Sequence, residues 1–241
     1  MQGLFITGTD TGVGKTAVLG ALLCALRRAG RDAVPMKPVQ TGGRRGRKGL
    51  TSPDLTLALA AAGLSPDASE RRLMCPYLFA PACSPHLAAA QAGRVIRIAA
   101  ILKAFHRLKT AHEIVLVEGA GGILVPLNRR ETMLDLMKAL ALPVVVAARP
   151  GLGTLNHTLL TLRELRRQGL RVLGVILVCT RPGRRGWIEQ SNLETIRRLG
   201  KTPVHYMGHL PALSHRNRPP ERLPTQALRE AARWLKLWHV F

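Results

Sequence analysis

The segment Gly8-Thr-Asp-Thr-Gly-Val-Gly-Lys-Thr16 decides the fold class of this chain. It follows a short apolar run, Leu4–Ile6, and precedes the helix-like run Ala17–Leu26, so it lies where a strand turns into a helix. Glycines in such a turn let backbone N–H groups surround phosphate oxygens, and the start of the helix adds partial positive charge. Lys15 would reach the outer phosphates and Thr16 would offer a hydroxyl to Mg²⁺. The segment therefore predicts a phosphate-binding loop, one residue longer than the standard motif.

Strand-like and helix-like segments alternate along the rest of the chain, which predicts a P-loop NTPase-like α/β fold. In this fold, helices cover both faces of a doubly wound, mostly parallel sheet. Strands are expected at 3–7, 33–39, 114–117, 143–148, 173–178 and 204–210, and helices at 16–29, 55–62, 87–91, 95–109, 158–167, 187–199 and 225–238. Because no linker-like composition divides the 241 residues, we expect a single domain over residues 1–241.

Signal segments and cysteines bear on the compartment of the protein. The N-terminus enters a strand directly, without a secretion signal, and no apolar run is long enough to cross a bilayer. The four cysteines are widely spaced and form no Cys-x-x-Cys pair: Cys24, Cys75, Cys83 and Cys179. These features favour a reduced, cytoplasmic protein without a disulfide framework or zinc site, and without a membrane partner.

The formal net charge of +22 raises the question of nucleic-acid binding. The basic residues are spread in short pairs and two loops, and aromatic residues make up only 4% of the chain. Stacking platforms for bases are therefore missing, and a solvated basic surface is favoured over a nucleic-acid partner. The basic loop Arg44–Lys48 has no mechanistic explanation from the sequence.

Polar residues beside the predicted strands are the candidates for chemistry. Lys37, in the segment Lys37–Gly42, is either a surface lysine or a second cation for phosphate or carboxylate. Asp54 precedes a predicted helix and is most simply a helix cap, with a metal role as the alternative. Glu118 ends a buried strand and is followed by glycines. Because a buried, unpartnered acid is costly, Mg²⁺ is the natural explanation for Glu118.

Two further segments leave their function open. His86, in Ser84-Pro85-His86, either binds a carboxyl group or is a structural residue at a helix start. Asn156 and His157 precede the predicted helix 158–167 and either cap it or contact a ligand.

Taken together, five motifs resemble the dethiobiotin synthetase family, in the family's order and over about residues 1–213. They are Gly8-Thr-Asp-Thr-Gly-Val-Gly-Lys-Thr16, Lys37-Pro-Val-Gln-Thr-Gly42, Ser84-Pro-His86, Glu118-Gly-Ala-Gly-Gly122 and Gly151-Leu-Gly-Thr-Leu-Asn-His157. The resemblance implies a homodimeric P-loop enzyme of biotin biosynthesis. The family closes the ureido ring of dethiobiotin from 7,8-diaminopelargonic acid, CO₂ and ATP, through a carbamate and its phosphoric anhydride.

The resemblance also implies roles for individual residues. Lys15 and Lys37 would stabilise carbamate and phosphate, Thr11 and Thr41 would hydrogen-bond substrate, and Thr11 would join the two lysines as catalytic residues. Mg²⁺ would be held by Thr16, Asp54 and Glu118. The nucleotide would be bound by Gly12, Val13, Gly14, Lys15, Thr16, Ala17, Glu118, Gly119, Ala120, Gly121, Val178 and Cys179. Asn156 would bind the tail carboxylate of the substrate across the dimer interface.

One position departs from the family pattern. The family commonly has an asparagine that reads the adenine edge where this chain has Val178, followed by Cys179. Losing a side chain that both donates and accepts would remove about 1–3 kcal/mol of base discrimination. Backbone groups near Val178 and at 211–213 would remain as contacts to the base. We therefore predict a nucleotide specificity looser than strict ATP.

Other classes of protein were compared with the same residues. A partitioning-type P-loop ATPase that binds DNA through a basic surface would suit the charge, but Asp10 stands where that class has a signature lysine. A cobyrinate-type amide-forming relative would need a glutaminase domain, for which this chain is too short. A degenerate nucleotide-binding paralogue is disfavoured by the intact set of candidate ligands, although Val178 keeps that alternative open.

Overall fold

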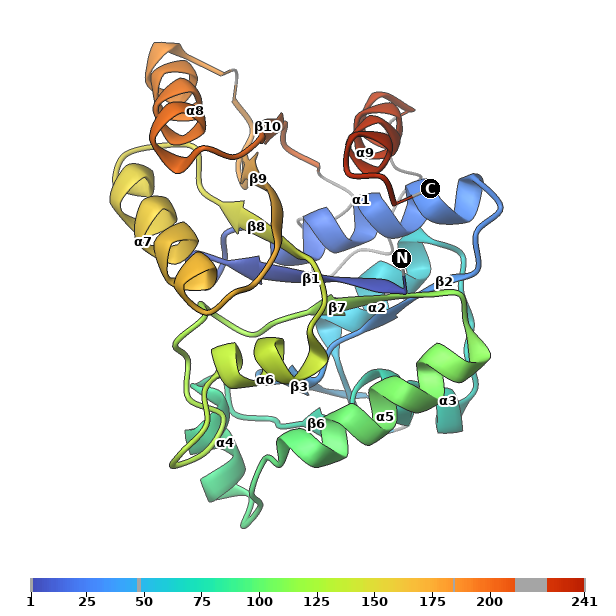
Figure 1. Ribbon diagram of the computed structural model, residues 1–241. Coiled ribbons are helices and arrows are strands. Elements are labelled where there is room, and N and C mark those ends of the chain that lie inside the picture. Colours follow the sequence, from blue (N-terminus) through green and yellow to red (C-terminus); the bar gives the residue numbers. More distant parts are fainter. Residues whose placement is uncertain (1, 47–48, 184, 211–224, 241) are drawn as a thin grey trace.

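A six-stranded parallel sheet forms the centre of the computed structural model, which describes residues 2–46, 49–183, 185–210 and 225–240 (Figure 1). The sheet order is β10-β9-β8-β1-β7-β2. Its strands are β1 (Gly3–Gly8), β2 (Ala33–Met36), β7 (Ile114–Glu118), β8 (Val144–Ala148), β9 (Val172–Val178) and β10 (Val204–Met207). Central β1 pairs with β7 on one side and β8 on the other, both parallel. The predicted α/β class is confirmed.

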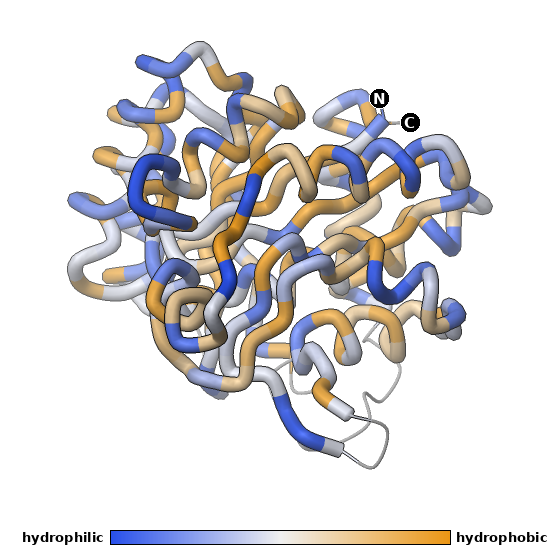
Figure 2. The backbone as a smooth tube through the Cα atoms, turned by 90° about the horizontal axis from the view of Figure 1, so that it is seen from below, coloured by the Kyte–Doolittle hydropathy of each residue, from blue (hydrophilic) through white to orange (hydrophobic). Residues whose placement is uncertain are grey.

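Helices cover both faces of the sheet. On one face lie α1 (Lys15–Arg28) and α9 (Thr225–Leu237), whose apolar side chains join those of Leu4 and Ile6 in one cluster. The other cluster contains Phe5 and side chains from α3 (Ala68–Met74), α5 (Ile98–Ala111), α6 (Met133–Leu140), α7 (Thr154–Arg167) and α8 (Trp187–Gly200). Successive residues of β1 thus point to opposite faces, as expected for a strand buried on both sides. Figure 2 shows the apolar segments concentrated inside and many hydrophilic loops outside.

The predicted strand 33–39 is wrong in its second half. β2 ends at Met36, and the Lys37 N–H donates to the Met74 carbonyl (2.7 Å) at the end of α3. The chain then forms β3 (Val39–Gln40), which pairs with β6 (Tyr77–Leu78) in a separate small sheet. Pro38 has no N–H to donate to the neighbouring strand of the six-stranded sheet. The chain therefore leaves this sheet at Lys37.

The helix predicted at 158–167 begins four residues earlier, because α7 starts at Thr154. Gly153, with φ +87°, provides the turn that precedes it. Asn156 and His157 therefore lie inside the first turn of α7 and do not precede the helix. Smaller differences affect α5, which begins at Ile98, and β10, which ends at Met207.

Several elements were not predicted from the sequence. They are α3, α6, β6 and the antiparallel hairpin of β4 (Arg44–Gly46) and β5 (Gly49–Thr51). The α6 start has a recognisable signal, because Thr132 and Asp135 form a capping box with a 2.8 Å bond from the Thr132 N–H. The remaining helices, α2 (Pro53–Ala61) and α4 (Pro85–Gln91), begin at prolines close to the predicted positions. In the described ranges, every helix is too short or too polar to cross a membrane.

Candidate active site

The turn between β1 and α1 has the backbone of an anion-binding loop. Gly12 and Gly14 adopt φ values of +72° and +95°, which side-chain-bearing residues rarely adopt. Gly14 is the N-cap of α1, and no side chain caps this end of the helix. The first N–H groups of α1 are therefore available to an anionic ligand.

Lys15 lies at the start of α1 and is buried. Its Nζ donates to the carbonyl oxygen of Asp10 (2.7 Å), within the same loop. Burial lowers the pKa of the Lys15 ammonium to about 8, and the nearby charge of Lys37 lowers it too. A bound anion would therefore stabilise the charged form of the Lys15 side chain.

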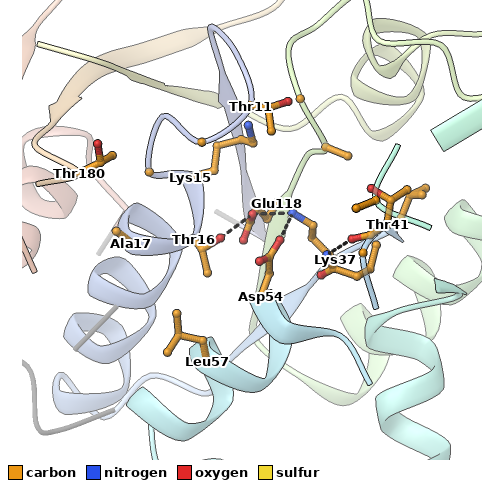
Figure 3. Close-up of a pocket in the computed structure, with 18 of the residues that line it drawn as sticks. Thr11, Lys15, Thr16, Ala17, Lys37, Thr41, Asp54, Leu57, Glu118 and Thr180 are labelled. Atoms are coloured by element: carbon orange, nitrogen blue, oxygen red, sulfur yellow. Dashed lines mark hydrogen bonds and ion pairs between the residues drawn. The ribbon is translucent and has the colours of Figure 1, made fainter. Parts of the chain in front are cut away.

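Lys37 forms a buried ion triad with two carboxylates (Figure 3). Its Nζ lies 2.6 Å from Glu118 Oε1 and 2.8 Å from Asp54 Oδ2. The Thr16 hydroxyl donates to the same Glu118 oxygen from the other side (2.9 Å). Glu118 ends β7, Lys37 directly follows β2, and Thr16 and Asp54 lie in the first turns of α1 and α2. The four residues meet because parallel strands end at the same edge of the sheet.

Burial and neighbouring charges act in opposite directions on the pKa values of these groups. Burial alone would lower the pKa of the Lys37 ammonium, but Asp54 and Glu118 raise it above its ordinary value. Burial raises the pKa of the Glu118 carboxyl, and the Lys37 ammonium opposes that effect. Two cations, Lys15 and Lys37, therefore lie near two carboxylates, so added negative charge is met by preorganised positive groups.

The helix-cap interpretation of Asp54 is wrong. Ser52 is the N-cap of α2, and its Oγ accepts from the Leu55 N–H (3.2 Å). The Ser52 hydroxyl in turn donates to Gln40 Oε1 (2.6 Å). Asp54 lies two positions after Ser52, in the first turn of α2, where its carboxylate reaches Lys37.

The oxygen atoms around Glu118 fit a hard divalent cation. Glu118 Oε2 is buried and has no hydrogen-bond partner among the described residues, and the Thr16 hydroxyl and Asp54 lie beside the same carboxylate. No group of three or more His, Cys, Asp or Glu side chains suited to a metal occurs in the described part of the chain. This donor set suits Mg²⁺, which takes few protein carboxylates and completes its shell with water and phosphate oxygens.

A pocket of about 620 Å³ opens over this cluster at the carboxyl end of the sheet. Fourteen of the residues predicted for the site line it: Thr11, Gly12, Gly14, Lys15, Thr16, Ala17, Lys37, Thr41, Asp54, Glu118, Ala120, Gly121, Val178 and Cys179. In Figure 3, Thr41 lies on the Lys37 side of the cavity and Thr180 beyond Lys15 on the opposite side. The phosphate-binding loop thus lies between two ends of the pocket, one at Thr41 and the other at Thr180.

Comparisons with known proteins identify the family. A family model described as an AAA domain, AAA_26, matches residues 2–219. The ATP-dependent dethiobiotin synthetase BioD of Anaeromyxobacter dehalogenans (strain 2CP-C) is 44% identical over 218 residues, covering 90% of this chain and 95% of that protein. BioD of Bacillus velezensis is 37% identical over 215 residues, covering 89% of this chain and 88% of the relative. This chain belongs to the dethiobiotin synthetase family.

Solved structures support the fold of this dethiobiotin synthetase family member. The cell-division protein MinD of Aquifex aeolicus superposes with a TM-score of 0.58 at 18% identity, covering 98% of this chain and 97% of that one. The MinC:MinD complex from the same organism gives 0.60 at 16% identity, with 98% and 96% covered. At this identity the likeness concerns the fold alone.

Five of the sequence candidates lie outside the pocket lining. Val13 is buried in the core, and the Gly119 carbonyl accepts from Lys37 Nζ (3.3 Å). His86 is exposed, and Asn156 and His157 are exposed on α7. The predicted base contacts at 211–213 lie outside the described residues, although the preceding Leu210 lines the pocket.

Seven lining residues were missed by the sequence reasoning: Leu57, Ala82, Cys83, Val125, Thr180, His209 and Leu210. A signal existed for three of them. Thr180, His209 and Leu210 follow β9 and β10 directly, and residues after parallel strands lie at the ligand-binding edge. The other four come from loops and a helix whose positions are set by tertiary packing.

Val178, where the sequence predicts a departure from the pattern of the dethiobiotin synthetase family, packs against the phosphate-binding loop. A Cβ atom placed on Gly14 would lie 2.5 Å from Val178 Cγ1. Next to it, the Cys179 thiol donates to the Arg181 carbonyl (3.0 Å). At this end of the pocket, Val178 thus offers an apolar surface and Cys179 has its S–H already engaged.

Proposed function

We propose that this chain closes the ureido ring of dethiobiotin from 7,8-diaminopelargonic acid, CO₂ and ATP. The observation that carries the proposal is the meeting of Lys15 and the Lys37–Asp54–Glu118 triad in one pocket beside the phosphate-binding loop. Membership of the family of ATP-dependent dethiobiotin synthetases supports it. We propose that residues 1–241 act as one domain in this reaction.

Each chemical step suits a site with fixed cations. One substrate amine attacks CO₂ and loses a proton, which gives a carbamate. A carbamate oxygen attacks the γ-phosphorus of ATP and the bond to ADP breaks. The second amine then attacks the carbamoyl carbon, loses a proton and expels phosphate, which closes the ring. Lys15 and Lys37 stabilise the negative charge on carbamate and transferred phosphoryl group.

Thr16, Asp54 and Glu118 are the residues that would hold Mg²⁺. When bound, the ion supplies neutralisation of phosphate charge and orients the transferred group. The unpartnered Glu118 Oε2 is the atom that most favours this assignment. Lys37 favours the ionised form of both carboxylates and holds one oxygen of each in place.

At the substrate end, Thr41 and Thr11 line the pocket and are proposed to hydrogen-bond the diamine. Asn156 is too exposed on α7 to belong to its own chain's pocket, which supports a role toward a second copy. Leu152 and Leu160 flank it at four-residue spacing and are 101% and 57% exposed. These two exposed leucines, one just before α7 and one on it, support a homodimer formed at this part of the surface.

At the nucleotide end, the side chains support a loose choice of base. Val178 has no polar atom, and the Cys179 thiol is engaged with Arg181. Thr180 is the nearest lining residue with an available hydroxyl. The prediction of a specificity looser than strict ATP therefore stays a prediction, with a structural reason.

A partitioning-type ATPase switch is the second candidate, favoured by the charge of +22. The loop itself argues against it. Asp10, at the position of that class's signature lysine, forms an ion pair with Arg149 at the end of β8 in its own chain. Asp10 therefore cannot replace a lysine that contacts the phosphates bound by a partner.

Product detection tests the proposal. The protein is incubated with 7,8-diaminopelargonic acid, bicarbonate and Mg²⁺, with ATP, CTP or GTP in separate reactions, and dethiobiotin is measured by mass spectrometry. Lys37→Met removes the cation while keeping a long side chain. Lys109→Met, on α5 and outside the pocket lining, is the matched control.

We expect product from the native chain and from K109M, and a loss of at least about a hundredfold in K37M. Substantial product with CTP or GTP would support the loose base specificity, whereas strict dependence on ATP would contradict that part alone. If no nucleotide supports product and DNA stimulates ATP hydrolysis, the switch function replaces the synthetase function.

A further inference from the structure

We propose that a groove between α3 and α5 is a second anion site, which binds a small phosphate monoester with an apolar body. The groove encloses about 360 Å³ and shares no lining residue with the candidate active site. Three cations, Arg72, Lys103 and Arg107, surround it, and its apolar floor includes Leu73, Pro76 and Ala104. In Figure 1, α3 and α5 lie side by side on the face of the sheet opposite α1.

The cations of α5 lack partners in the described part of the chain. Lys103 and Arg107 are four residues apart, so their side chains lie on the same face of the helix. α5 contains no aspartate or glutamate between Ile98 and Ala111. Neither Lys103 nor Arg107 makes a side-chain hydrogen bond or an ion pair with a described residue. Two like charges at this spacing repel each other, and a bound anion would remove that repulsion.

The carboxylates closest in sequence to Arg72 are engaged in other contacts. Asp67 accepts from the Ser69 hydroxyl (2.6 Å) and the Glu70 N–H (2.8 Å), although its charge still acts on Arg72. The Glu70 carboxylate is bound to His112 Nε2 (2.7 Å). Among the described residues that line the groove there is no carboxylate. The groove therefore keeps an excess of positive charge.

The shape and chemistry of the groove select the class of ligand. Guanidinium groups match the oxygens of a tetrahedral dianion, and the two arginines come from opposite helices. Leu73, Pro76 and Ala104 present only apolar side chains, which favour a hydrocarbon body over a second charged group. The size suits a small organic molecule.

Calorimetric titration with 1-naphthyl phosphate tests this site. The full-length protein is first saturated with ADP and Mg²⁺ so that the phosphate-binding loop does not contribute. 1-Naphthol and inorganic phosphate are titrated separately, because each has one half of the proposed ligand. Arg107→Ala is the test variant, and Lys109→Ala on the same helix is a control with the same change of net charge.

We expect saturable binding of 1-naphthyl phosphate at one site, about tenfold weaker in R107A and unchanged in K109A. Each half-ligand should bind more weakly than the whole. The proposal is overturned by the absence of saturable binding, or by equal loss in both variants, which would mean a diffuse effect of charge.

A second experiment tests whether the groove binds a membrane surface instead of a small molecule. Vesicles that contain phosphatidic acid present the same headgroup chemistry on a lipid surface. Sedimentation of the protein with these vesicles in an Arg107-dependent manner, without binding of 1-naphthyl phosphate, would also overturn the proposal. Unchanged thermal unfolding of R107A and K109A shows that these side chains were removed without loss of the fold.

Discussion

At the scale of single residues, Lys37 determines the electrostatics of the site. It is the cation between Asp54 and Glu118, and it lies on the turn where the chain leaves β2. A buried ion pair contributes little net stability when intact, but removing one partner leaves a buried charge uncompensated. A bound divalent cation would contact the same two carboxylates, Asp54 and Glu118, as the Lys37 ammonium.

Replacement of Lys37 by methionine should therefore change stability in a way that depends on Mg²⁺. We expect K37M to lose about 3–5 kcal/mol of unfolding free energy without metal. Mg²⁺ should raise its melting temperature by more than it raises that of the native chain, because the ion then takes the place of the ammonium. Differential scanning calorimetry with and without MgCl₂ measures both effects.

A second variant separates metal binding from general destabilisation. K37M combined with Glu118→Gln retains only one of the two carboxylates, so its response to Mg²⁺ should fall below that of K37M alone. An equal response to Mg²⁺ in the native chain and both variants would show that these oxygens do not bind the ion.

At the scale of helices and strands, the sequence predicts best where one segment contains the whole signal. The strands at 143–148 and 173–178 and the phosphate-binding loop are such segments, because a buried parallel strand is a continuous apolar run. α3 is short and polar over most of its length, and only Met74 is buried. Its place depends on contacts with α5 and β2, which the local sequence does not contain.

The candidate site shows the same limit. Lys15, Thr16 and Glu118 could be placed from the sequence, since each lies at a strand end or helix start. The function of Asp54 depended on Ser52 taking the cap, a competition between neighbouring side chains that the sequence alone left undecided. The sequence predicts Asn156 before a helix because the glycines at 151 and 153 break the helical pattern, although α7 begins directly after Gly153.

Packing of α9 on β10 predicts a pH dependence of stability. His205 lies between Trp234 and Trp238, with ring centroids 5.4 and 5.9 Å away. Burial lowers the pKa of His205 to about 4, and the charges of Arg197 on α8 and Arg233 on α9 lower it too. The unfolded chain therefore takes up a proton first, so the unfolding free energy should fall as pH falls from about 6.5 to about 4.

His205→Phe should reduce this loss, because the variant keeps an aromatic ring and has no titrating group. Its urea midpoint should change less between pH 7 and pH 5 than that of the native chain, as followed by tryptophan fluorescence. His205 Nε2 has no hydrogen-bond partner among the described residues, so the substitution breaks no bond that the structure shows. Parallel pH profiles of both proteins would contradict the prediction.

At the scale of the whole molecule, the arrangement of active sites depends on whether α7 joins two copies. Leu152, just before α7, and Asn156 and Leu160 on it are exposed and do not line the pocket of their own chain. If Asn156 serves the partner's substrate, each site needs residues from both chains. The net charge of +22 opposes association at low ionic strength. In a dimer, apolar contacts of Leu152 and Leu160 would have to outweigh this repulsion between the two copies.

Mixing two inactive variants tests this shared site. K37M still supplies Asn156, and Asn156→Ala still supplies Lys37, so a mixed dimer has one intact site and one doubly defective site. Random exchange in a symmetric dimer should restore about a quarter of the native activity. Mixing K37M with Thr16→Ala is the matched control, because both defects lie in the same chain's pocket.

Recovery in the first mixture alone would establish that residue 156 acts across the interface. No recovery in either mixture, with dimers confirmed by light scattering, would place Asn156 outside the catalytic arrangement.

The contact between Val178 and Gly14 limits the order in which this chain can change during evolution. Position 14 needs glycine for its backbone angle and because Val178 leaves no space for a Cβ atom. Position 178 has no such double restriction, and smaller or polar residues there would leave the phosphate-binding loop intact. Single substitutions at position 178 can therefore change the nucleotide preference, in evolution or in laboratory selection. A substitution at position 14 would first disrupt the phosphate-binding loop.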